Sequence, residues 1–205
     1  MRRFSKTLVR AHVGVLIAVV AACAGIAILA SLPTIIHTAS AEPRTVGSML
    51  ALTLVLQLFS VPVYGRGGIG ASAVGILATA FLLNTETAMA VAVVTALAHW
   101  AHRRREVKKA IFDTGNFVLS AGAAGAAFAA ISGAPRLVAA AVGGCVFAAL
   151  NIGLVCFAMS LTEGIAFGSI WRERFHWARY YFLAFGPLAL VADADPRRVL
   201  RVGRG

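Results

Sequence analysis

The chain has 205 residues, of which 60% are hydrophobic and only 13% are charged, and its mean hydropathy is +0.83. A soluble domain is roughly 45–50% apolar and about 25% charged, so this composition argues against a water-soluble domain and predicts an integral membrane protein in a lipid bilayer. The net charge is +11. The cations lie between apolar runs, without interleaved exposed aromatics, so we expect no nucleic-acid partner.

Seven apolar stretches predict an all-α, polytopic transmembrane helix bundle of six to seven short spans, in a single domain over residues 1–205. They cover residues 9–32, 46–63, 69–83, 88–101, 111–131, 137–160 and 177–192. The third and fourth, at about 15 residues, are shorter than the roughly 20 that a span needs. They form either two brief helices or one broken hairpin buried by its neighbours. Breaker and polar residues predict the turns between the stretches at Leu32-Pro33, Gly65–Gly68, Asn84–Thr87 and Ser132–Pro135.

The first stretch also resembles a secretory signal, because it has a basic start and small residues at Ala39-Ser40-Ala41. Its apolar run of about 20 residues exceeds the 7–15 that are typical of a signal peptide. We therefore expect a retained first helix.

The cations predict the orientation, because Lys and Arg favour cytoplasmic loops. Four lie in residues 1–10 and five in residues 102–110, whereas the predicted outer loops hold Arg44 and Arg136 alone. This distribution predicts a multi-pass protein of the cell membrane with a cytoplasmic amino terminus. Seven spans would place the arginines of residues 197–204 on the outer side of the membrane, although arginine favours cytoplasmic segments. Either the last stretch, which Gly186-Pro187 interrupts, does not cross, or the tail is an exception.

Polar residues inside apolar stretches are the best candidates for function, because each must be paired or face a cavity in hydrocarbon. Asp113, Asn116 and Ser120 have the spacing of one helix face, and Asn151 lies in the middle of another stretch. As a ligand-binding set, these four residues would hydrogen-bond a small polar molecule. The structural alternative is that Asp113 pairs with Lys109 or Arg105 and that Asn151 joins two helices.

Other motifs point away from catalysis. The sequence contains none of the P-loop, zinc-protease or nucleophile-elbow signatures, so we expect no enzyme and no cofactor. His99 and His102 share a helical face, but no carboxylate or cysteine accompanies them, so we expect no metal site. The small residues from Ser120 to Ala127 predict close helix packing, with Gly143-Gly144 as a matching surface.

Three segments carry a family resemblance: Lys109–Ser120, Asn151–Ser160, and Trp171–Leu188. Together with the preceding short stretches, they resemble the amino-terminal membrane regions of bacterial, especially actinobacterial, HD-type phosphohydrolases and diguanylate-cyclase-like proteins. Those vitamin-uptake-like regions are similar to the substrate-binding subunits of energy-coupling-factor transporters. The sequence departs from the family at Asp113, where asparagine is usual, at Asn116, where glutamine is common, and at Phe117, where tyrosine is common.

The resemblance implies a membrane sensor-like or small-ligand-binding module. In the family, the region continues into another helix and a cytoplasmic output domain. This sequence stops at Gly205 with neither, so a separate cytoplasmic phosphohydrolase or cyclase is the expected partner. One alternative is the substrate-binding subunit of a small-molecule importer, whose partner would be a transporter ATPase. Another is a membrane anchor without ligand.

Overall fold

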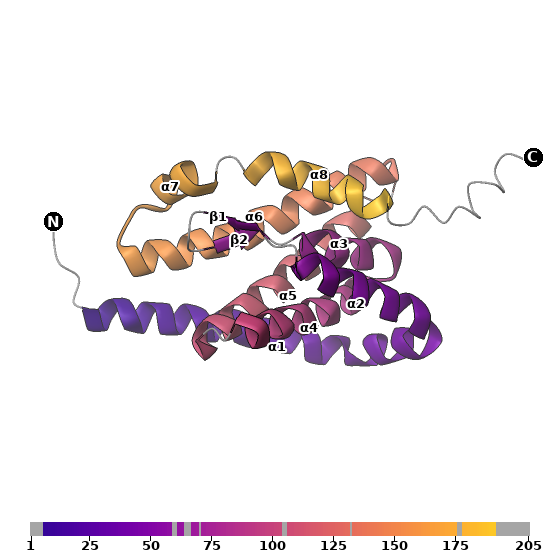
Figure 1. The fold of residues 1–205 in the computed structure, drawn as a ribbon, viewed down its shortest axis with the longest axis horizontal. Coiled ribbons are helices and arrows are strands. Elements are labelled where there is room, and N and C mark those ends of the chain that lie inside the picture. Colours follow the sequence, from indigo (N-terminus) through magenta and orange to yellow (C-terminus); the bar gives the residue numbers. More distant parts are fainter. Residues whose placement is uncertain are drawn as a thin grey trace, which may run out of the picture.

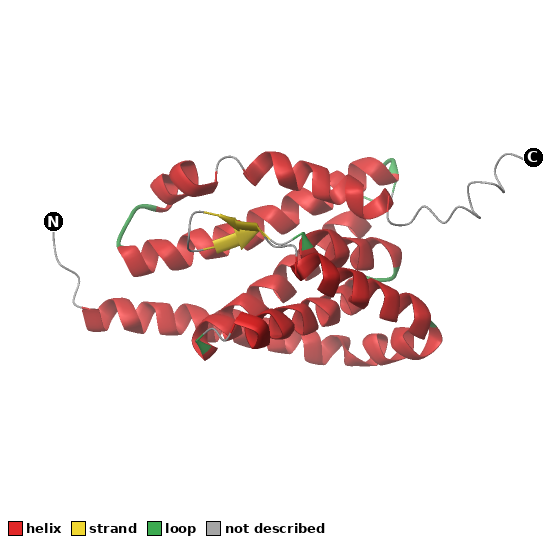
Figure 2. Ribbon diagram, in the orientation of Figure 1, coloured by secondary structure: helices red, strands yellow, loops and turns green. Residues whose placement is uncertain are grey.

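A computed structural model of the chain describes residues 6–58, 61–63, 67–69, 71–103, 106–131, 133–175 and 178–191. These residues are almost entirely helical, so the predicted all-α class is confirmed (Figure 2). The elements are α1 (Lys6–Ala41), α2 (Pro43–Leu58), β1 (Val61–Val63), β2 (Gly67–Ile69), α3 (Ser72–Leu82), α4 (Thr85–Arg103), α5 (Val107–Ala130), α6 (Arg136–Glu163), α7 (Phe167–Ile170), the π-helical turn η1 (Trp171–Phe175) and α8 (Ala178–Val191).

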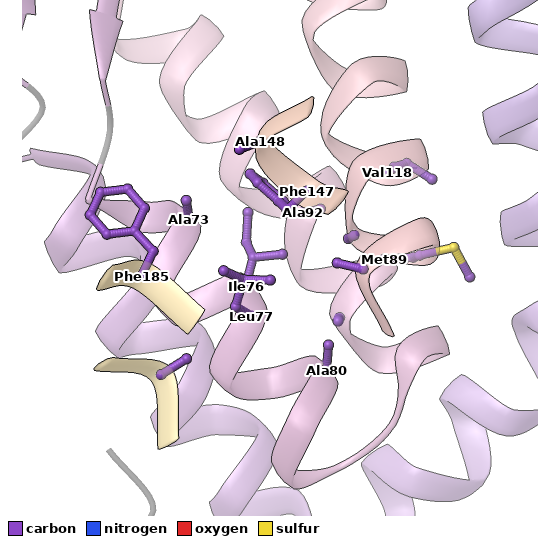
Figure 3. Close-up of a cluster of buried hydrophobic side chains, with 14 of the residues drawn as sticks. Ala73, Ile76, Leu77, Ala80, Met89, Ala92, Val118, Phe147, Ala148 and Phe185 are labelled. Carbon is purple, nitrogen blue, oxygen red and sulfur yellow. The ribbon is translucent and has the colours of Figure 1, made fainter. Parts of the chain in front are cut away.

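Helix α5 packs against α1, α4 and α6, and α6 packs in turn against α8 (Figure 1). The core cluster draws on α3, α4, α5, α6 and α8, with Ile76, Leu77 and Phe147 among its most buried side chains (Figure 3). The central helix α3 presents nearly all of its residues to neighbouring helices. Its 11 residues span only about 16 Å.

Small residues allow the closest helix contacts, as predicted for the α5–α6 pair. A Cβ added to Gly143 of α6 would lie 3.1 Å from the Ala124 carbonyl oxygen of α5. Gly186 of α8 lies directly against the backbone of Ala140, so a Cβ there would collide with the Ala140 carbonyl. A side chain at Gly186 would therefore force α6 and α8 apart, whereas one at Gly143 would require a smaller shift of its neighbours.

Two predicted boundaries are wrong. The helix predicted to end at Leu32-Pro33 continues through Pro33 to Ala41. Proline removes one backbone hydrogen bond, but α1 is continuous through it. Near the end of α1, Asn84 Nδ2 donates to Thr38 Oγ1 at 2.8 Å. The second helix ends at Leu58 rather than Val63, because residues 61–63 form a strand.

That strand, β1, pairs with β2 in an antiparallel hairpin in which Val61 faces Ile69 and Val63 faces Gly67. Pro62 lacks a backbone N–H and disfavours helix, and its two β-branched neighbours favour an extended chain. Gly67 and Gly68, predicted as part of a turn, belong to β2. The rest of that predicted turn, residues 65–66, lies outside the described residues.

Two of the described helices have the length and hydropathy of a membrane span: α1, over Ala11–Ala41, and α6. This criterion does not support the predicted six to seven spans. The 11-residue α3 is too short on its own, and α5 carries Asp113 and Asn116 in its first half. The number of crossings near the carboxyl end depended on the arginines of residues 197–204. These residues lie outside the described part of the chain.

Candidate functional site

Three of the four predicted ligand-binding residues meet at the contact between α5 and α6. Asn116 and Ser120 are buried, and Ser120 Oγ donates to Asn116 Oδ1 at 3.4 Å. Asn116 Nδ2 donates to the backbone carbonyl of Asn151 at 3.2 Å. The Asn116 amide therefore has a partner at each end. The side chain that joins α5 to α6 is therefore that of Asn116, and Asn151 contributes its backbone carbonyl to this bond.

Asp113 lies one turn before Asn116 on α5 and is half-buried. Lys109, one of its expected partners, forms an exposed ion pair with Glu106 at 3.9 Å, and the other, Arg105, lies outside the described residues. The side chain of Asn151 is half-buried as well. None of the four predicted residues lines either of the two cavities described below.

A different buried polar pair joins α2 to α4. Gln57 Nε2 lies 2.8 Å from His99 Nδ1, and Gln57 is only 8% exposed. With the amide nitrogen as donor, the ring nitrogen is the acceptor and the histidine proton is on Nε2. The other amide atom, Gln57 Oε1, is buried and has no hydrogen-bond partner among the described residues. An unpaired buried acceptor of this kind is rare in folded proteins and calls for a specific explanation.

The local sequence explains why this pair faces inward. Gln57 follows Thr53 by one turn, and Thr53 is fully buried where α2 crosses Gly75 of α3. His99 follows Thr95 by one turn, and Thr95 is also fully buried. Residues four apart share a helix face. Each polar side chain therefore continues the buried stripe of its helix, and the two stripes meet.

Beside this pair is a cavity of about 310 Å³. Its described lining includes four apolar residues and three polar ones. The apolar residues are Leu54, Val55, Leu58 and Ala98, and the polar ones are Gln57, His99 and His102. None of these seven is acidic, lysine or arginine. We refer to this cavity as the Gln57 cavity.

Of these polar residues, His99 and His102 were predicted from the sequence to share a helix face, and Gln57 was not singled out. The two histidines do lie on the same side of α4, as predicted. Within the described part of the chain, no group of three or more His, Cys, Asp or Glu residues could hold a metal ion. Gln57 could have been found by the criterion that selected Asn151, since it is a single amide inside the apolar run Leu54–Leu58.

A second cavity, of about 450 Å³, lies between α1, α4 and α5. Among the described residues its lining is apolar except for Thr114 and Trp100, and none of their unpartnered buried polar atoms belongs to it. The other buried hydroxyls that lack a partner in the described ranges, Ser72 Oγ and Thr87 Oγ1, line neither cavity. Of these two cavities, the Gln57 cavity has the larger share of polar residues in its described lining.

No protein-family model matches the chain, and no curated protein matches it in sequence. The resemblance to vitamin-uptake-like sensor regions therefore remains a prediction from the residues.

Proposed function

We propose that this chain is a multi-pass integral membrane module that binds a small molecule in the Gln57 cavity and signals to a separate cytoplasmic partner. The observation that carries the proposal is the lining of the Gln57 cavity, where the polar side chains of Gln57, His99 and His102 lie among apolar ones. Small-molecule sites combine a mostly apolar concave lining with a few convergent polar groups. The Gln57 cavity has this composition, with three polar side chains beside four apolar ones.

Support for the membrane setting comes from the large apolar side chains on the surface. Along α1, Val15, Ile26, Leu29 and Ile36 are each more than 60% exposed. Soluble monomers rarely expose continuous apolar surface of this kind. Exposed valine, leucine or isoleucine also occurs on α2, α4, α5, α6 and α8. In the proposed topology these side chains contact lipid, and the basic segments before α1 and between α4 and α5 lie in the cytoplasm.

Support for signalling comes from the place of the cavity along α4. His102, which lines the cavity, is followed directly by the basic sequence of residues 103–105, and exposed Lys108 and Lys109 begin α5. A ligand that bridges α2 and α4 would change the position of the end of α4. Because α4 leads into this basic segment, the change would reach a surface that suits an acidic partner. By the family resemblance, that partner is a phosphohydrolase or a cyclase.

The test is native purification of the full chain from membranes, followed by mass spectrometry for bound small molecules and partner chains. We expect the wild-type chain to purify with a bound small molecule. The Gln57→Met variant should purify without this molecule, and the Asn116→Leu variant should still carry it. Methionine keeps the length of glutamine and lacks the amide. Asn116 is the matched control, because it is also a buried amide but borders neither cavity. A wild-type chain without any small molecule, or a Gln57→Met chain that keeps it, would contradict the proposal. Co-purification with an ATPase would reassign the chain to an importer.

A further inference from the structure

We propose that the chain binds an anionic phospholipid in the second cavity, with one acyl chain between α1, α4 and α5 and the headgroup beside Lys108. We refer to this cavity as the Trp100 cavity. The site goes beyond the proposed function: it shares the membrane setting, but it is separate from the Gln57 cavity and takes its ligand from the bilayer itself. Three observations carry it, which are the opening of the cavity to the surface, its length, and the cation at one of its ends.

The Trp100 cavity opens on the surface of the helix bundle. Its exposed lining residues include Leu97, Trp100, Val107 and Ile111. On the α1 side, Gly25 leaves open space, because a Cβ added there would meet nothing within 4 Å. Within a bilayer, lipid tails surround such a surface and are as apolar as its side chains. An acyl chain can therefore enter this cavity of about 450 Å³ from the side.

The length of the cavity matches the depth of one leaflet. Its lining on α5 runs from Val107 to Val118, which is about 16 Å along the helix axis. The hydrocarbon core of a bilayer is about 30 Å thick, so one leaflet is about 15 Å deep. Val107 begins α5 directly after the basic segment that lies in the cytoplasm in the proposed topology. The cavity therefore runs from the inner interface to about the middle of the bilayer, where the acyl chain of an inner-leaflet lipid lies.

Lys108 provides positive charge for the headgroup at the interfacial end of the cavity. It is exposed, and it shares a face of α5 with Ile111 and Gly115, which both line the cavity. Trp100 lines the cavity from α4 and belongs to a residue type that favours the level of the headgroups. Basic residues beside a cavity between helices on the cytoplasmic side suit anionic headgroups. An acidic protein segment could contact Lys108 as well, but only a lipid would use both the cation and the apolar cavity.

The neighbouring cation differs from Lys108 in its helix face and in its partner. Lys109 forms an ion pair with Glu106 at 3.9 Å. It shares a face of α5 with Phe112 and Asn116, neither of which lines the cavity. Lys109→Gln is therefore the matched control for Lys108→Gln, because each variant removes one exposed positive charge from the first turn of α5.

Gly25 offers a test of the cavity itself. Gly25→Phe would place a phenyl ring in the open space and displace the acyl chain. Gly153→Phe on α6 is the matched control, because a Cβ there would also meet nothing within 4 Å and Gly153 does not line the cavity. If Gly25→Phe does not fold, Leu97→Trp serves instead, because Leu97 is an exposed lining residue of α4.

The assay is native mass spectrometry of the full chain in detergent, titrated with dioleoylphosphatidylglycerol or dioleoylphosphatidylcholine. The two lipids carry the same acyl chains, and only the first has a net negative charge. The dissociation constant of the first bound lipid is compared between lipids and between variants.

We expect the wild-type chain to bind phosphatidylglycerol at least about fivefold more tightly than phosphatidylcholine, since one lysine beside an anionic headgroup contributes a factor of this order. Lys108→Gln should weaken phosphatidylglycerol binding about fivefold, and Lys109→Gln by less than about twofold. Gly25→Phe should weaken the binding of both lipids at least about tenfold, because an acyl chain loses several buried methylene groups. Gly153→Phe should bind both lipids as the wild-type chain does.

Equal binding of the two lipids by the wild-type chain would overturn the headgroup assignment, and so would equal effects of Lys108→Gln and Lys109→Gln. Phosphatidylglycerol binding that Gly25→Phe leaves unchanged would overturn the acyl-chain site and leave Lys108 as part of a surface for an acidic protein partner. The small molecule expected in the Gln57 cavity is tested separately by Gln57→Met, so either site can fail while the other stands.

Discussion

Replacing Gly143 with alanine tests the close contact of α6 with α3 and α5. The new Cβ would lie 2.8 Å from Phe81 Cζ and 3.1 Å from the Ala124 carbonyl oxygen. The Phe81 ring has little freedom to move away, because it is buried and stacked on Phe128 with 4.3 Å between the ring centroids. Overpacking of this kind destabilises proteins by about 1–3 kcal/mol, whereas alanine gains about 1 kcal/mol over glycine in a helix.

Gly153 provides the matched control on the same helix, because a Cβ there would meet nothing within 4 Å. Gly153→Ala should therefore keep the helix-propensity gain without the overpacking. We expect Gly143→Ala to be less stable than Gly153→Ala by about 1–3 kcal/mol. At roughly 2–4 °C per kcal/mol for a chain of this size, the melting temperatures should differ by about 2–12 °C.

The assay is thermal unfolding of the purified chains in one detergent, followed by size-exclusion chromatography with fluorescence detection. Both variants replace a helical glycine with alanine, so the gain in helix propensity cancels when their melting temperatures are compared. The difference that remains reports the contact of residue 143 with Phe81 and Ala124. If Gly143→Ala melts at the same temperature as Gly153→Ala or above it, the packing described for α3, α5 and α6 is wrong.

Three further predictions concern other parts of the bundle. Asn116→Leu should lower stability by about 0.6–2 kcal/mol in the same melting assay, since the hydrogen bond to the Asn151 carbonyl is lost; unchanged stability would refute its joining role. Asn84→Ala should cost about 0.5–2 kcal/mol, because its Oδ1 accepts the backbone N–H of the first turn of α4 at 2.7 Å; an unaltered melting temperature would show that the cap is dispensable. In a cysteine-free background, Ser40→Cys should react with a membrane-impermeant maleimide on intact cells, and Lys108→Cys only after permeabilisation. The reverse pattern would invert the proposed topology.

Much of the helical arrangement was predictable from the sequence, because apolar runs and breaker residues are local signals. Asn84 and Pro135 each stand directly before a helix, as their turn and cap preferences indicate. The errors arose where a local rule competed with a distant contact. Pro33 should end a helix by local reasoning, but α1 continues to Ala41, and its last turns are bonded to Asn84 from far along the chain.

The candidate site was less predictable, because its pairing is not local. Asn116 was correctly singled out as a buried amide, but its partner is the backbone carbonyl of Asn151, which side-chain patterns do not reveal. Gln57 and His99 are 42 residues apart. Only the packing of α2 beside α4 makes them a pair, so the residues alone did not suggest the cavity beside it.

The most direct test of the account is whether the folded chain requires lipid or detergent. Membranes from cells that express the full chain would be washed with alkaline carbonate, and the chain followed in pellet and supernatant. We expect it to stay in the pellet and to come into solution as a monodisperse folded species only when detergent is added. A chain that enters the carbonate supernatant and remains folded and monodisperse in plain buffer would contradict the membrane setting on which the proposed ligand binding and signalling depend.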